Sequence, residues 1–131
     1  MSRALLDTSV VIAAADGADV ALPGEAAISV VTLGELRAGV LRARDAAARL
    51  ERLTRFELIR SSFIPLPVDE EVADHYGRAL ARARDEGRIE KPLDLLIIAT
   101  AAASDNVLHT LDKAQAKLAR RLGLVVQGPG A

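Results

Sequence analysis

Four acidic residues occupy positions from which their carboxylates could share one ligand. In an open parallel sheet, ligands bind beyond the carboxyl ends of the strands, so acids directly after a predicted strand or in the first turn of the next helix are candidates. The sequence places four acids in this way: Asp7, Glu35, Asp94 and Asp112. Converging carboxylates repel one another and raise one another's pKa unless a cation neutralises them. The pattern therefore predicts a cation site.

The ion that this set favours is a hard divalent cation. The chain has no cysteine, and neither His75 nor His109 has a partner at metal-binding spacing, so we assign both histidines to ordinary structure. The remaining oxygen ligands favour Mg²⁺ or Mn²⁺ over zinc. Such an ion lowers the pKa of a bound water and stabilises charge on a phosphodiester. Hydrolysis of a nucleic-acid backbone is the reaction class that fits best.

Each acid also has a purely structural explanation. Asp7 and Asp112 could cap the helices that follow them. Thr32 and Glu35 fit a capping box, in which the glutamate folds back onto the cap amide. Asp94 could complement a helix dipole. Taken singly, these caps are the commoner explanation, but four of them at one sheet edge favour the cation site.

Three hydroxyl residues flank the acids, namely Thr8, Ser9 and Thr110. Their side chains could orient a carboxylate, a water or a phosphate oxygen, or serve turns and caps instead. Arg37 follows Glu35 by two positions. It could contact a nucleic-acid phosphate or a partner, although a surface ion pair is the commoner role for such a residue.

The chain alternates short apolar runs with helical patterns. The expected strands are 4–6, 26–31, 62–68, 106–110 and 124–126. The expected helices are 8–15, 32–42, 45–59, 69–87, 92–104 and 113–122. Strands separated by helices need crossover connections, which predict a parallel sheet covered on both faces. We expect one three-layer α/β/α domain over residues 1–131, with the third strand at an edge because of its two prolines and with 127–131 as a flexible tail.

Composition excludes several other classes of protein. Half of the 131 residues are hydrophobic and 27% are charged, which is typical of a globular chain. The longest apolar stretch, 95–103, is too short to cross a bilayer, and no segment resembles a signal peptide, so we expect a cytoplasmic protein without a membrane contact. The net charge of −1 provides no bulk attraction to nucleic acid. Seven arginines between residues 37 and 60 could form a basic face or a solvated surface with ion pairs such as Glu51–Arg55.

Four segments together resemble the motifs of PIN domains, and in particular of VapC-type toxins. LLDTSVV (5–11) resembles the opening strand with its aspartate, and TLGELRAG (32–39) is similar to the glutamate segment of these toxins. DLLIIATA (94–101) is similar to the third acidic motif, and TLD (110–112) matches the fourth. The four motifs occur in the family's order and cover nearly the whole chain. One departure is that no aromatic residue follows the fourth motif within 113–116.

The resemblance implies a PIN-like fold whose parallel sheet has the order 3-2-1-4-5. It also implies an acidic pocket built from the four acids, one or two Mg²⁺ or Mn²⁺ ions, and endonucleolytic cleavage of RNA. A homodimer held inactive by a cognate antitoxin protein is the expected assembly. We hypothesise that Asp7 holds the principal ion together with Asp94 or Asp112, while Glu35 binds a second ion or orients the attacking water.

Other functions remain open at this point. A PIN nuclease that is not a toxin has the same chemistry. A phosphatase with Asp7 as nucleophile needs a second aspartate two residues later, where Ser9 stands. A receiver-like module needs a pair of acids after the first strand and a lysine after the last, and neither is present. An inactive interaction module is disfavoured because all four acids are intact.

Overall fold

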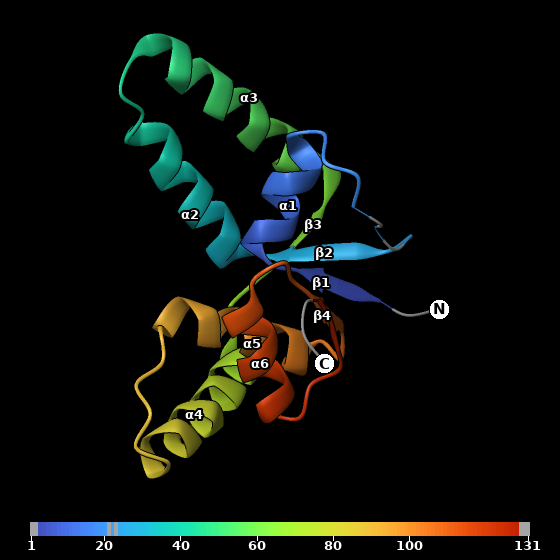
Figure 1. Ribbon diagram of the computed structural model, residues 1–131, viewed down its shortest axis with the longest axis vertical. Coiled ribbons are helices and arrows are strands. Elements are labelled where there is room, and N and C mark those ends of the chain that lie inside the picture. Colours follow the sequence, from blue (N-terminus) through green and yellow to red (C-terminus); the bar gives the residue numbers. More distant parts are fainter. Residues whose placement is uncertain (1–2, 21, 23, 129–131) are drawn as a thin grey trace.

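A computed structural model describes residues 3–20, 22 and 24–128 and contains five strands and six helices in these ranges (Figure 1). The strands are β1 (Ala4–Leu6), β2 (Ala26–Ser29), β3 (Ile64–Leu66), β4 (Val107–His109) and β5 (Val126–Gln127). The helices are α1 (Thr8–Ala15), α2 (Val30–Leu41), α3 (Ala46–Ser62), α4 (Glu70–Asp85), α5 (Pro92–Ala103) and α6 (Lys113–Arg121).

The strands form one parallel sheet in the order β3-β2-β1-β4-β5, as expected. The order places β3, with Pro65, at an edge, where a residue without an N–H costs no central ladder bond. The middle strand β1 pairs with β2 on one side and β4 on the other, with Leu6 opposite both Ile28 and His109. The carboxyl ends of these three strands therefore meet at one edge.

Each face of the sheet has its own apolar core. Helices α1, α2 and α3 cover one face, and α4, α5 and α6 cover the other (Figure 1). Side chains of a strand alternate between faces, so Leu5 packs with Leu95, Ile98 and Leu108, whereas Leu6 packs with the other core. All of β1 is buried, as expected for a central strand. Burial on both faces fixes the position of β1 in the sheet, and therefore the position of Asp7, which directly follows it.

Several boundaries differ from the sequence expectations. Strand β2 ends at Ser29, because the Ser29 hydroxyl accepts the Val31 N–H and starts α2 two residues earlier than predicted. Strand β5 begins at Val126 rather than Leu124. The tail predicted from residue 127 is wrong at its start. Gln127 lies in β5 and accepts the Thr110 N–H at 3.1 Å. Residues 129–131 of that predicted tail lie outside the described residues.

Several of the clustered arginines join helices rather than forming a free basic face. Arg52 donates to the Gly39 carbonyl at 2.7 Å and Arg49 to the Leu41 carbonyl at 3.3 Å, so both satisfy acceptors at the C-terminal end of α2. Arg55 pairs with Asp16 at 3.4 Å rather than with Glu51. The contacts of Arg49 and Arg52 join α3 to α2, and the pair of Arg55 with Asp16 joins α3 to the end of α1.

Candidate active site

Asp7 leaves the end of β1 with its carboxylate held by three hydrogen bonds. The side chain is 4% exposed and caps α1 by accepting the Val10 N–H at 3.3 Å. The Ser9 hydroxyl donates to Oδ1 at 2.5 Å, and the Thr110 hydroxyl donates to Oδ2. Asp7 therefore does cap α1, as its structural explanation in the sequence analysis predicts. The cap and two hydroxyls fix the orientation of a buried carboxylate at the sheet edge.

The segment after β4 is joined to the same point. The Thr110 hydroxyl accepts the Asp112 N–H at 3.0 Å while donating to Asp7, and the Leu111 N–H donates to the Ser9 hydroxyl at 3.0 Å. Asp112 caps α6, because its Oδ1 accepts the Gln115 N–H at 3.1 Å, but its side chain is exposed. The two hydroxyls therefore connect the first and fourth acidic motifs.

Glu35 reaches this edge through a hydroxyl of α1. The Thr8 hydroxyl donates to Glu35 Oε1 at 2.8 Å and lies 3.1 Å from the Thr32 hydroxyl. Because α2 begins at Val30 and is capped by Ser29, Glu35 lies in the second helical turn. The proposed capping box of Thr32 and Glu35 is wrong: Thr32 is fully buried, and the glutamate carboxylate accepts from Thr8.

Asp94 lies in the first turn of α5, which has no side-chain cap. Burial raises the pKa of its carboxyl above the ordinary value of 3.8. The Lys91 ammonium lowers this pKa, whereas the charges of Asp112, Asp7 and Glu90 raise it further. Mutual repulsion of this kind requires proximity, so Asp94 belongs to the same acidic edge as Asp7 and Asp112.

The donor chemistry of this edge fits a hard divalent cation. Within the described ranges, no group of three or more His, Cys, Asp or Glu side chains is arranged so that it could hold a metal ion. Mg²⁺ needs no such group, because it usually keeps several waters and binds through one or two carboxylates. Burial is the largest cause of the raised Asp94 pKa, and the neighbouring carboxylates add a smaller repulsion that a cation would relieve. The fit rests on this repulsion and on oxygen donors alone.

Two further residues contact this edge without being candidates from the sequence. Thr32 fits a cap by its spacing, but its hydroxyl contacts Thr8. Gln115 is 3% exposed, and its Nε2 donates to the Asp94 carbonyl at 3.2 Å. The only sequence signal for Gln115 is its place three residues after Asp112, which is the usual distance from a cap to the N–H it accepts.

Among the described residues, the side chains of Arg37 and of both histidines form no hydrogen bond with the four acids or with the hydroxyls around them. The Arg37 guanidinium lies over the Phe56 ring, 4.4 Å from its centroid, and forms no ion pair with the residues that the structure describes. The ion-pair alternative for Arg37 is therefore not observed. His109 contributes its carbonyl, which accepts the Asp7 N–H at 2.9 Å. Burial lowers the pKa of the His109 imidazole.

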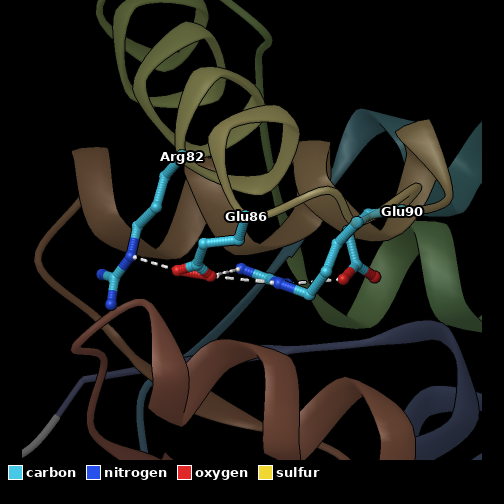
Figure 2. Close-up of polar contacts among 4 residues, drawn as sticks. Arg82, Glu86 and Glu90 are labelled. Atoms are coloured by element: carbon cyan, nitrogen blue, oxygen red, sulfur yellow. Dashed lines mark hydrogen bonds and ion pairs between the residues drawn. The ribbon is translucent and has the colours of Figure 1, made fainter.

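Arg88 holds the loop that leads into Asp94 through two carboxylates. Figure 2 labels these carboxylates, Glu86 and Glu90, together with Arg82. The Arg88 guanidinium donates to Glu90 Oε1 at 2.6 Å and to Glu86 Oε2 at 2.6 Å, and Arg82 donates to the other Glu86 oxygen at 3.3 Å. The hydrogen bond from Arg88 lowers the pKa of Glu86, and the bond from Glu86 raises the pKa of Arg88. Arg88 therefore closes the turn between α4 and α5 just before Pro92 and Asp94.

Replacing Arg88 with methionine is expected to lower the thermal unfolding midpoint, because two carboxylates lose their shared partner and repel one another. Thermal denaturation followed by circular dichroism measures the effect. Arg78→Met is the matched control, since Arg78 forms only an exposed helical pair with Asp74 at 3.0 Å, and pairs of this kind contribute little. Equal shifts for the two variants would show that Arg88 has no special role in the loop.

A five-stranded parallel sheet of order 3-2-1-4-5 with helices on both faces defines a PIN-like α/β protein. The PIN domain family model matches residues 4–121, and the chain belongs to that family. The chain is 44% identical over 100 residues to ribonuclease VapC8 of Mycobacterium tuberculosis, which covers 74% of this chain and 88% of the relative. It is 39% identical over 114 residues to ribonuclease VapC4 of the same organism, which covers 84% and 86%.

Solved structures agree with this assignment. The crystal structure of VapBC-5 from Mycobacterium tuberculosis, a member of the VapBC family of toxin–antitoxin systems, contains a chain that matches with a TM-score of 0.81 and 33% identity over 98% of both chains. A chain of the DNA-bound VapBC from Salmonella typhimurium matches with a TM-score of 0.80 at 23% identity, over 98% of both chains. The second likeness shows the shared fold alone.

Proposed function

We propose that this protein is a metal-dependent endoribonuclease and the toxin of a toxin–antitoxin pair. The observation that carries the proposal is the buried Asp7 carboxylate, held by hydroxyls from α1 and from the end of β4, with Asp94 close enough for mutual repulsion. The relatives named as ribonucleases support RNA as the substrate. The proposed site consists of Asp7, Glu35, Asp94 and Asp112.

The residues of the chain divide into ligands and positioning groups. Asp7, with Asp94 or Asp112, holds the principal Mg²⁺ or Mn²⁺. When bound, the ion supplies a water of lowered pKa and stabilises charge on the phosphodiester. Glu35, oriented by the Thr8 hydroxyl at 2.8 Å, holds a second ion or orients the attacking water. Ser9 and Thr110 hold Asp7 in place. Arg37 is the proposed contact for RNA phosphate or for a protein partner.

The proposed partners follow from the resemblance and from the VapBC structures. We infer that a cognate antitoxin protein binds and inhibits this chain, as the description of VapBC-5 as a toxin–antitoxin system suggests. A homodimer is proposed on the resemblance alone. No helix within the described residues is long and apolar enough to cross a membrane. A cytoplasmic location is proposed on the sequence expectation alone.

Removal of divalent metal is expected to abolish RNA cleavage. Purified protein is incubated with a mixed pool of RNAs in Mg²⁺, in Mn²⁺ and in EDTA, and the products are resolved on denaturing gels. Cutting is expected with either metal, and it should disappear in EDTA and return when metal is restored. Cleavage that persists undiminished in EDTA, or folded protein that cuts no RNA in either metal, would contradict the proposal.

A further inference from the structure

Gln115 contacts both acid-bearing segments on the far side of the sheet from Glu35. It lies in the first turn of α6 and is 3% exposed. Its main-chain N–H donates to Asp112 Oδ1 at 3.1 Å, and its side-chain Nε2 donates to the Asp94 carbonyl at 3.2 Å. Gln115 thus bridges the N-terminal ends of α5 and α6. Asp94 lies in the first turn of α5, and Asp112 caps α6.

Packing and hydrogen-bond satisfaction do not explain why a glutamine occupies this position. The Gln115 Oε1 atom is buried and has no hydrogen-bond partner among the described residues, and an unpaired amide oxygen destabilises the folded state. The Asp94 carbonyl lies inside α5, where the N–H of the residue four positions later is its regular partner. An apolar side chain of similar size would fill the same space without the unpaired oxygen.

The amide of Gln115 makes a connection that the backbone does not supply. Within the described residues, α5 and α6 contribute side chains to the same apolar core, but their backbones approach one another at few positions. Gln115 contacts both the Asp112 carboxylate and the Asp94 backbone, so the two acids lie near one another, and like charges tend to separate unless something restrains them. The hydrogen bond from Nε2 to the Asp94 carbonyl opposes that separation.

We propose that Gln115 is a positioning residue that sets the separation of Asp94 and Asp112 for divalent metal binding. The proposal rests on the metal-dependent function proposed above. Gln115 touches neither the substrate nor the ion. Its amide restrains the backbone of one carboxylate while its N–H orients the other. Groups behind metal ligands commonly change metal affinity by about 10- to 100-fold when they are removed.

The test is the Gln115→Met variant, which keeps the volume and removes the amide. Mn²⁺ binding is measured by isothermal titration calorimetry, and unfolding is measured in EDTA. We expect the dissociation constant for Mn²⁺ to rise about tenfold, at the lower end of the range for such groups, with an unchanged or higher unfolding midpoint. RNA cleavage by the variant should recover as the Mn²⁺ concentration is raised.

Two further variants make the result unambiguous. Gln127→Met carries the same substitution at an exposed strand position and should bind Mn²⁺ like the wild type. Gln115→Asn keeps the amide but shortens its reach, and it should weaken Mn²⁺ binding as the methionine does. Unchanged affinity in both Gln115 variants overturns the inference, as does a loss of affinity that only follows a loss of stability. If the wild type neither binds Mn²⁺ nor cuts RNA, the proposed function itself fails.

Discussion

Replacing Asp7 with asparagine is expected to lower metal-dependent RNA cleavage by at least about a hundredfold while the protein stays folded. Asparagine caps helices as well as aspartate does, so α1 should keep its start. The size of the side chain is also preserved in a position that is 4% exposed. The substitution removes the negative charge, which a divalent ion requires, and one of the two acceptor oxygens, so one of the two hydroxyls must reorient. Initial rates of cleavage at matched Mg²⁺ measure the loss.

Asp45→Asn is the matched control for this prediction. Asp45 caps α3 by accepting the Ala48 N–H at 2.8 Å, and it is exposed. The same substitution therefore changes charge and cap chemistry away from the acidic edge, and we expect its cleavage rate to equal that of the wild type. If Asp7→Asn retained wild-type cleavage, or if both variants lost it equally, Asp7 would have no special part in the reaction.

The order of the elements follows from the sequence because each strand carries its own burial pattern. The run Ala4-Leu5-Leu6 can be buried on both faces, and Pro65 belongs at an edge, so a covered parallel sheet is predictable from local residues. Strand order is not local information. In the sequence analysis it came from the resemblance, because β1 pairs with β2 and β4 across long stretches of chain.

Boundaries were misplaced where two local signals compete. Val30 and Val31 favour a strand by their β-branched side chains, yet they begin α2 because the Ser29 hydroxyl caps it. At the other end of the chain, Leu124 is apolar but donates its N–H to the Ala119 carbonyl. With Gly123 at a φ of +89°, this bond completes a Schellman motif at the end of α6, so the strand begins later.

The candidate site was predictable as a set of acids but not as a set of contacts. Placement after strands and at helix starts identified the acids without any knowledge of their neighbours. The Thr110 hydroxyl on Asp7 and the Thr8 hydroxyl on Glu35 join residues 103 and 27 positions apart, and no local spacing encodes such pairs. Gln115 was missed for the same reason, since its side chain acts on α5 rather than on its own helix.

Replacing Asp94 with asparagine is expected to abolish cleavage and, in metal-free protein at neutral pH, to raise the unfolding midpoint by a few degrees. The pKa of the Asp94 carboxyl is raised in the folded state, chiefly by burial and further by Asp112 and Asp7. A raised pKa means that folding favours the protonated form. The ionised carboxylate therefore destabilises the fold, increasingly as pH rises from the unfolded value near 3.8 through the folded pKa. Asparagine removes this penalty because it cannot ionise.

Thermal unfolding in EDTA across this pH range, and again with Mn²⁺ at neutral pH, separates stability from metal binding. The midpoint difference between Asp94→Asn and wild type should be smallest in acid and should grow as the pH rises, whereas Asp45→Asn should show no such trend. Added Mn²⁺ should stabilise the wild type but not Asp94→Asn, because a ligand that binds only the folded state raises its stability. A metal-free Asp94→Asn protein less stable than wild type at neutral pH would mean that repulsion at the acidic edge is not what this carboxylate contributes. A metal-free Asp94→Asn protein more stable than the wild type would show that the ionised Asp94 carboxylate lowers the stability of the fold. Its presence would then be explained by binding a cation.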